Sequence, residues 1–138
     1  MHKLQAELTN KFGENDIITE SNITELSYLV ACIKETLRIA FAYSLLDSSS
    51  CTLDVPERFL DSNVNFRGQD FGLIPFGAGI RIFHGLALSK QEIHLILASL
   101  IHYFEWSLPI GEDPMQLDME DKFGVTLQKE KPLLIVPM

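Results

Sequence analysis

Three glycines fall within the nine residues 77–85, and a long apolar segment follows them directly. Residues 76–85 read Phe-Gly-Ala-Gly-Ile-Arg-Ile-Phe-His-Gly. Glycine adopts positive φ without strain and lets a backbone approach a partner closely. The segment that follows predicts a helix over residues 86–104, whose N-terminus directs the positive end of its dipole at this loop. We therefore expect the loop to hold a ligand or a flat neighbouring group.

The helix over residues 86–104 is the strongest helix that the pattern predicts, because its apolar side chains recur at helical spacing. The side chains expected to be buried are Leu86, Ile93, Ile96, Leu97, Leu100, Ile101 and Phe104. The polar residues Lys90, Gln91, Glu92 and His94 exclude a membrane span. His94 and His102 are separated by roughly 12 Å of helix rise, so they cannot share a zinc ion.

Two further helices are predicted, one over residues 2–12 and one from the caps Ser21 and Asn22 to about Ala40. The apolar stripe of the second helix consists of Leu26, Leu29, Val30, Ile33 and Leu37. The opposite face is also largely apolar and consists of Tyr28, Ala31, Cys32 and Ile39 around Glu35. A carboxylate on a buried apolar face is costly unless it is paired, and Arg38 lies three residues further on.

The composition allows one domain with a real core, since 46% of the 138 residues are hydrophobic. The net charge of -8 argues against nucleic acid or an anionic membrane surface as a partner. Cys32 and Cys51 lack the spacing of a zinc or redox motif, which favours a reduced, intracellular chain. The first residues lack the apolar segment of a signal peptide or membrane anchor, so we expect a soluble protein.

The carboxyl-terminal part is predicted to contain turns and short strands after Pro109. The clearest strand candidates are residues 123–127 and 133–136. The acidic residues between 112 and 121 are interpreted as a solvated face without a catalytic pair. The expected fold class is mixed α+β with helix dominant.

The glycine loop resembles the haem-ligand loop of the cytochrome P-450 family, whose pattern is Phe-x-x-Gly-x-Arg-x-Cys-x-Gly. Phe76, Gly79, Arg81 and Gly85 match this pattern in register, and Phe83 stands at the position of the cysteine. The cysteine thiolate is the axial ligand of the haem iron in this family. Phenylalanine has no lone pair to give to iron, so the resemblance implies a loop without its metal ligand.

Two more motifs are similar to elements of the same family and follow its order. Residues 35–38, Glu-Thr-Leu-Arg, match the Glu-x-x-Arg signature, and residues 56–59 match the Pro-Glu-Arg-Phe element. The resemblance implies that Arg58 closes a buried network with Glu35 and Arg38. A glutamate and an arginine at this spacing also form ordinary surface salt bridges, which is the alternative interpretation.

The resemblance describes residues 1–138 as one partial cytochrome P-450 domain. Residues 1–40 form a helical segment with the Glu-x-x-Arg motif, and residues 41–55 form a junction loop. Residues 56–138 contain the Pro-Glu-Arg-Phe element, the haem-ligand loop, the long helix and the β region. Relatives carry a proline-rich segment and two strands where this chain has the junction loop. We therefore expect the C-terminal part of the cytochrome P-450 fold with an internal deletion.

Residues 61–76 and 122–129 resemble one plant branch of the family, which includes geraniol hydroxylases and ferruginol synthases that oxidise terpenoids. The resemblance implies a haem cofactor and the NADPH- and O2-dependent oxidation of a small apolar metabolite of plant secondary metabolism. It also implies an NADPH-cytochrome reductase as the electron donor. Full-length relatives are anchored in the endoplasmic reticulum membrane.

Three functions follow as hypotheses: a truncated, degenerate copy without activity, an active monooxygenase, and a small non-catalytic module. Such a module would bind a protein partner, or haem through Arg81 and His84. The matching arginine of the family binds a haem propionate, and a surface charge is the alternative for Arg81. His84 lies one residue beyond the ligand position, and an exposed or packed histidine is the alternative to iron ligation there. The first hypothesis is preferred because Phe83 replaces the thiolate.

Overall fold

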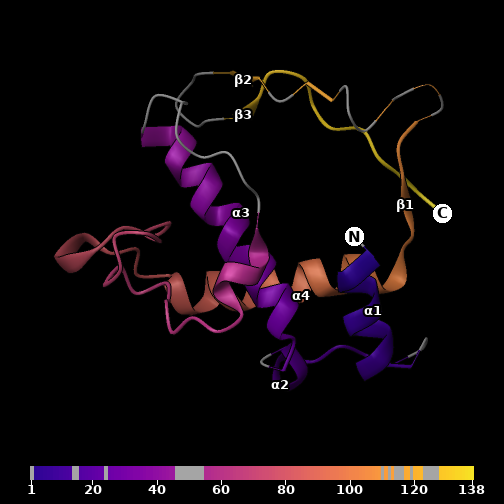
Figure 1. The fold of residues 1–138 in the computed structure, drawn as a ribbon, viewed down its shortest axis with the longest axis horizontal. Coiled ribbons are helices and arrows are strands. Elements are labelled where there is room, and N and C mark those ends of the chain that lie inside the picture. Colours follow the sequence, from indigo (N-terminus) through magenta and orange to yellow (C-terminus); the bar gives the residue numbers. More distant parts are fainter. Residues whose placement is uncertain are drawn as a thin grey trace. The chain divides into compact units, whose positions relative to one another are not determined.

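The computed structural model describes residues 2–13, 16–23, 25–45, 55–109, 111, 113, 117–118, 120–122 and 128–138. The chain divides into two compact units, residues 1–102 and residues 103–138. The described helices all begin in the first unit, and the described strands lie in the second (Figure 1). The expectation of a helix-dominant chain with a small β region is therefore confirmed.

Helix α1 spans His2–Lys11, in agreement with the prediction of a helix over residues 2–12. Its buried residue is Leu8, and Leu4 packs against the same core from one turn earlier. Phe12 follows the helix and is also buried. These residues recur on one side of the helix, so α1 contributes one apolar face to the core of the first unit.

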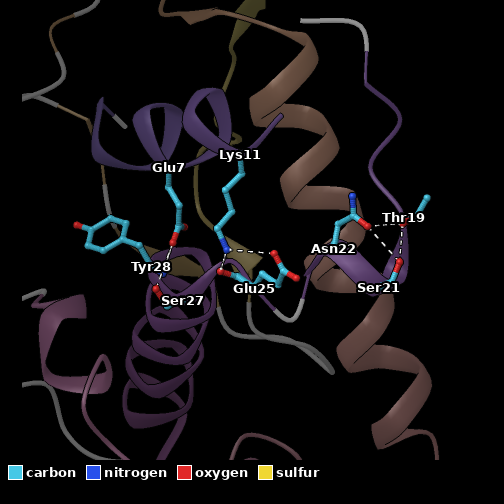
Figure 2. A network of polar contacts seen from close by, with 8 residues as sticks. All are labelled: Glu7, Lys11, Thr19, Ser21, Asn22, Glu25, Ser27 and Tyr28. Atoms are coloured by element: carbon cyan, nitrogen blue, oxygen red, sulfur yellow. Dashed lines mark hydrogen bonds and ion pairs between the residues drawn. The ribbon is translucent and has the colours of Figure 1, made fainter. Parts of the chain in front are cut away.

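The second predicted helix is wrong at both ends. The chain forms two helices at its start, and the helix expected to end near Ala40 continues to Leu45, into the expected junction loop over residues 41–55. Helix α2 spans only Glu20–Ile23, and helix α3 spans Ser27–Leu45. The expected caps Ser21 and Asn22 lie inside α2, where Thr19, Ser21 and Asn22 contact one another through their side-chain oxygens (Figure 2). Their hydrogen-bonding capacity is used locally, which agrees with the preference of these residue types for turns.

The N-terminus of α3 is capped by Glu7, which reaches it from α1 (Figure 2). Glu7 Oε1 accepts hydrogen bonds from the backbone N–H of Tyr28 at 2.8 Å and the hydroxyl of Ser27 at 3.3 Å. Glu7 Oε2 accepts from the backbone N–H of Leu29 at 2.9 Å. A carboxylate at this end of a helix satisfies free N–H groups and interacts favourably with the dipole. Leu26 precedes α3 and has no side-chain acceptor, so Glu7 supplies the cap.

A second contact joins the same two helices beside the Glu7 cap. Lys11 donates a hydrogen bond to the carbonyl oxygen of Glu25, and its Nζ lies 3.6 Å from Glu25 Oε2 (Figure 2). Lys11 belongs to the last turn of α1, and Glu25 lies in the turn between α2 and α3. Two contacts therefore fix α1 against the start of α3, the Glu7 cap and the contact of Lys11 with Glu25.

Helix α3 and the residue before it bury most of the stripe that the sequence predicts, but Val30 is only half-buried. Leu26, Leu29 and Ile33 are buried, and Leu37 packs against the core. The second face is buried too at Ala31 and Glu35. A helix that is covered on two sides needs a partner for any charged group on either side.

Helix α4 spans Leu86–Tyr103, one residue shorter than predicted. Leu86, Ile93 and Ile101 pack against the core as expected. The expected burial is wrong at four other positions, because the exposed side chains include Ile96, Leu97, Leu100 and Phe104. The fully buried positions of α4 are His94 and Ala98. Since α4 is apolar around most of its circumference, hydrophobic spacing could not select which face would be covered.

Two short turns connect α3 with α4 in sequence. The 3-10 helix η1 spans Pro56–Phe59, and the 3-10 helix η2 spans Gly79–Arg81. Pro56 opens η1, where its fixed φ suits a helical turn and its missing N–H is not needed. Phe59 is buried and anchors this turn in the core.

The second unit contains two antiparallel strand pairs. Strand β1, Trp106–Ser107, pairs with β4, Val136–Pro137, and strand β2, Asp121–Lys122, pairs with β3, Gln128–Lys129. The predicted strand over residues 133–136 overlaps β4 only at Val136. The predicted strand over residues 123–127 lies outside the described residues. The backbone N–H of Met138 extends the first pair by donating to the carbonyl oxygen of Glu105 at 2.8 Å.

Among the described residues, no helix combines the length and the apolar character that crossing a bilayer requires.

We predict that Glu7→Ala lowers the free energy of unfolding by about 1–2 kcal/mol, because α3 loses the acceptor for its first N–H groups. Chemical denaturation followed by circular dichroism measures this change. The control is Glu92→Ala on α4, where the glutamate is exposed and has no hydrogen bond or ion pair within the described residues. Equal destabilisation by the two variants would contradict the capping role.

Candidate functional site

A buried carboxylate on α3 forms the centre of the first candidate site. Glu35 is only 2% exposed. Its Oε2 accepts a hydrogen bond from Arg38 Nε at 2.9 Å, and its Oε1 accepts one from Arg38 Nη2 at 2.8 Å. The two residues are three apart on one helix, so they lie on the same face. The parallel pair of hydrogen bonds is the geometry in which an arginine binds a carboxylate most strongly.

The turn η1 brings two more groups to the same carboxylate. The backbone N–H of Val55 donates to Glu35 Oε1 at 3.3 Å, and Arg58 Nε lies 3.8 Å from the same oxygen. Helix α3 and η1 pack against each other along this contact. The structure therefore brings together Glu35, Arg38 and Arg58, the three residues assigned to one network from the sequence.

The electrostatics of Glu35 favour its ionised form. The hydrogen bond from Arg38 lowers the pKa of Glu35, and the N–H of Val55 and the charge of Arg58 act in the same direction. Burial acts against them and raises the pKa, but the net direction is downward. An ionised carboxylate with its oxygens already engaged has no proton to give near neutral pH. This arrangement suits a structural role better than acid or base catalysis.

The glycine loop is closed by backbone hydrogen bonds. The N–H of Phe83 donates to the carbonyl oxygen of Phe76 at 3.0 Å, across the loop. The N–H of Ile82 donates to the carbonyl oxygen of Gly79 at 3.2 Å. Gly77 and Gly79 have φ of 76° and 67°, a conformation that other residues adopt only with strain. The glycines are thus needed for the path of the backbone.

The side chain of Phe83 lies against Phe76 in this loop. The two rings are stacked with centroids 6.2 Å apart, and Phe76 meets Phe66 edge to face at 6.1 Å. A Cβ atom at Gly85 would lie 2.8 Å from the Phe83 ring, so this glycine leaves room for it. The ring is nevertheless 51% exposed. Position 83 therefore presents an apolar surface and no electron-pair donor.

The remaining candidate residues of the loop are exposed. Arg81 ends η2 and His84 follows Phe83, and both have exposed side chains. No cluster of three or more histidine, cysteine, aspartate or glutamate side chains among the described residues could hold a metal ion. The residues present do not fit a haem iron bound through position 83, because a phenyl ring cannot ligate iron. His84 carries the only imidazole of residues 76–85.

A cleft of about 880 Å³ lies beside this loop, and sequence patterns did not reveal it. Its walls come from α2, α3, α4, the segment 64–67 and the loop residues 82–84. The lining includes the cations Lys34, Arg67 and Lys90, and His94, which is buried. The spacing of Lys90 and His94, four residues apart on α4, is a signal that they share a helix face. Nothing in the sequence pattern connects that face to Lys34 or Arg67.

The cytochrome P450 family model matches residues 1–54 and residues 55–136 of this chain. A cytochrome P450 monooxygenase of Lophophora williamsii is 39% identical over 173 residues, which cover 100% of this chain and 34% of that relative. (S)-N-methylcoclaurine 3'-hydroxylase isozyme 1 of Papaver somniferum is 41% identical over 168 residues, covering 97% of this chain and 35% of the relative. Geraniol 8-hydroxylase of Catharanthus roseus is 39% identical over 171 residues, which cover 99% of this chain and 35% of that relative. The chain spans about a third of the length of these curated relatives.

We predict that Glu35→Gln lowers the free energy of unfolding by about 3 kcal/mol, because the half-buried Arg38 then loses the charged carboxylate that accepts its two hydrogen bonds. The pKa of Glu35 is lower in the folded than in the unfolded chain, so the unfolded chain binds more protons at acidic pH. The contribution of Glu35 is complete above the unfolded pKa and is lost as the pH falls through the folded pKa. Denaturation curves between pH 3 and 7 should therefore show a flatter pH dependence in the variant.

The matched control for this prediction is Glu57→Gln on the adjoining turn η1. Glu57 pairs with Lys3 at 2.5 Å, but both side chains are exposed, so solvent screens the pair. A smaller loss of stability is expected there than for Glu35→Gln. A loss at Glu57 that matched the loss at Glu35 would count against a special role for the buried network.

Proposed function

The chain belongs to the cytochrome P450 family, and we propose that it derives from a haem-dependent monooxygenase but has no monooxygenase activity itself. The ancestral reaction would be the NADPH- and O2-dependent oxidation of a small apolar plant metabolite such as a terpenoid. Similar relatives named geraniol 8-hydroxylase and carnosic acid synthase support this substrate class. The hydroxylase named for N-methylcoclaurine is equally similar, so the proposal covers small plant metabolites generally.

The observation that carries the proposed lack of activity is the side chain at position 83. Phe76, Gly79, Arg81 and Gly85 stand in register with the family loop, and Phe83 takes the place of its iron-ligating cysteine. A thiolate supplies the axial ligand that favours O–O bond cleavage in cytochrome P450 enzymes. The exposed phenyl ring cannot replace it, and the loop keeps its closed backbone without a donor. Haem chemistry of this family would therefore have no axial ligand from this position.

An internal deletion is part of the same proposal. The family model matches two segments that adjoin in this chain, at residues 54 and 55. An alignment 173 residues long that includes all 138 residues of this chain leaves 173 minus 138, or 35, positions without a counterpart here. We place the missing residues in the junction that the sequence sets at residues 41–55, after the end of α3 at Leu45 and before Val55. In the family this region follows the Glu-x-x-Arg helix and borders the haem pocket.

Other roles follow from the family and are part of the proposal. Arg81 would contact a haem propionate, since its guanidinium suits carboxylate geometry. Glu35, Arg38 and Arg58 would hold the scaffold beneath the loop. A full-length ancestor would take electrons from an NADPH-cytochrome reductase.

A second candidate function is a residual haem-binding module without catalysis. Its support is the exposure of both Arg81 and His84 on one short loop, where an imidazole could approach iron. The absorption spectrum of added haem distinguishes this candidate from the first. Imidazole ligation would appear in the unmodified chain and disappear in His84→Ala.

We predict that the purified chain, titrated with haem, gives no thiolate-type absorption band in the reduced, CO-bound state. It should also give no NADPH-dependent product from geraniol with a plant reductase supplied. Phe83→Cys restores the missing donor, and Phe83→Ala is its matched control because it removes the ring without adding a thiol. Absorption spectra of the three proteins, recorded under the same conditions, make the comparison.

The possible spectra separate the two causes of inactivity. A thiolate-type band in Phe83→Cys alone would assign the loss to the ligand position. Absence of stable haem binding in all three proteins would assign it to the missing segment as well. NADPH-dependent product from the unmodified chain would refute the proposal.

A further inference from the structure

The cleft beside the glycine loop combines a large volume with an apolar wall. Its volume of about 880 Å³ falls in the range of small-molecule sites. Val30 of α3, Phe66 and the exposed ring of Phe83 are among its apolar lining residues. The cleft lies entirely within the first unit, residues 1–102. All of its lining residues therefore belong to one unit.

Three cations line the same cleft against a single carboxylate. Lys34 lies on α3, Lys90 lies on α4, and Arg67 lies on the segment between η1 and η2. None of the three forms an ion pair within the part of the chain that the structure describes. Glu20 is the one acidic residue among the described lining residues. In a chain of net charge -8, this local excess of positive charge is unusual.

The two lysines are close enough to affect each other. Burial lowers the pKa of Lys34, and the positive charge of Lys90 lowers it further. The Nζ of Lys34 lies 5.8 Å from the centroid of the Phe59 ring, and that of Lys90 lies 5.8 Å from the centroid of Phe66. Aromatic faces stabilise such cations only modestly. An anion between the lysines would relieve their mutual repulsion.

A buried polar atom adjoins this charge cluster. His94 lines the cleft from α4 and is 2% exposed. Its Nδ1 donates to the carbonyl oxygen of Lys90 at 2.5 Å, while its Nε2 has no hydrogen-bond partner within the described residues. Burial lowers the pKa of His94, so the ring is neutral, and because Nδ1 carries the proton, Nε2 is an acceptor. It can take a hydrogen bond from a donor group of a bound molecule, such as a hydroxyl, and it does not contact the anionic group itself. The cleft therefore contains an unpartnered polar atom as well as three cations that form no ion pair within the described residues.

We propose that this cleft binds a small amphipathic anion, with its carboxylate or phosphate group between Lys34, Lys90 and Arg67 and its apolar body against Val30, Phe66 and Phe83. Ammonium and guanidinium groups are the usual protein partners of both anionic groups. The apolar wall distinguishes this occupant from a free inorganic ion, which has no surface to bury there. The proposal requires neither haem nor a monooxygenase reaction.

Isothermal titration of the full chain without haem tests the proposal with four probes. The probes are octanoate, octyl phosphate, 1-octanol and inorganic phosphate. We expect both amphipathic anions to bind about tenfold or more tightly than 1-octanol and than inorganic phosphate, since each of these lacks one of the two interactions. The ranking of octanoate and octyl phosphate identifies which anionic group the cleft prefers.

Variants locate the site and separate charge from folding. Lys34→Gln and Lys90→Gln should each weaken octanoate binding about tenfold and leave 1-octanol binding unchanged. Lys34→Arg should retain the affinity because it keeps the charge. Lys122→Gln, in the second unit, is the matched control for a lost lysine and should have no effect. Circular dichroism confirms that each variant is folded, and shifts of the His94 ring resonances report binding in the cleft.

Three outcomes would overturn the proposal. Equal affinities for octanoate and 1-octanol would exclude a role for charge. Binding of inorganic phosphate as tight as that of octyl phosphate would exclude a role for the apolar wall. Equal effects of Lys90→Gln and Lys122→Gln would exclude the cleft as the site. Because no haem or reductase is present, each of these results leaves the proposed loss of monooxygenase activity untouched.

Discussion

The buried carboxylate of Glu35 is the interaction on which the first unit depends. Removing a charge from water is costly, and here two hydrogen bonds from Arg38, the N–H of Val55 and the charge of Arg58 offset that cost. Val55 directly precedes the turn η1 and Arg58 belongs to it, and this turn precedes the glycine loop in the sequence. The carboxylate therefore joins α3 to the turn η1.

Glu7 plays a related role at the N-terminus of α3, whereas Glu35 lies in the middle of that helix. Both carboxylates accept backbone N–H groups that lie about 20 residues away in sequence, at Tyr28 for Glu7 and at Val55 for Glu35. Glu7 accepts hydrogen bonds from free N–H groups at the start of α3, and Glu35 accepts one from the residue that precedes η1. Acidic side chains in this chain thus act as connectors between segments, which explains why its negative charge is not all solvated surface.

The glycine loop shows that a loop's backbone conformation and its reactive side chain are independent of each other. The positive φ of Gly77 and Gly79 and the cross-loop hydrogen bond maintain the backbone path, while the side chain at position 83 is an aromatic ring stacked on Phe76. A loop can keep its conformation without the group that performs a reaction, because backbone geometry and metal ligation depend on different atoms. The exposed apolar side chains of α4 agree with a chain about a third as long as its relatives.

The sequence by itself determined the extent of α1 and α4, the buried stripe of α3 and the family, because periodic apolar residues and short motifs are local signals. It also placed Glu35 and Arg38 within reach of each other. Only the tertiary structure decided that α3 begins at Ser27, that α4 buries His94 in place of Ile96, and that Lys34 and Lys90 share a cleft. Each of these depends on residues far away in sequence: a cap from another helix, the residues that cover one face of α4, and a cleft lined by several helices.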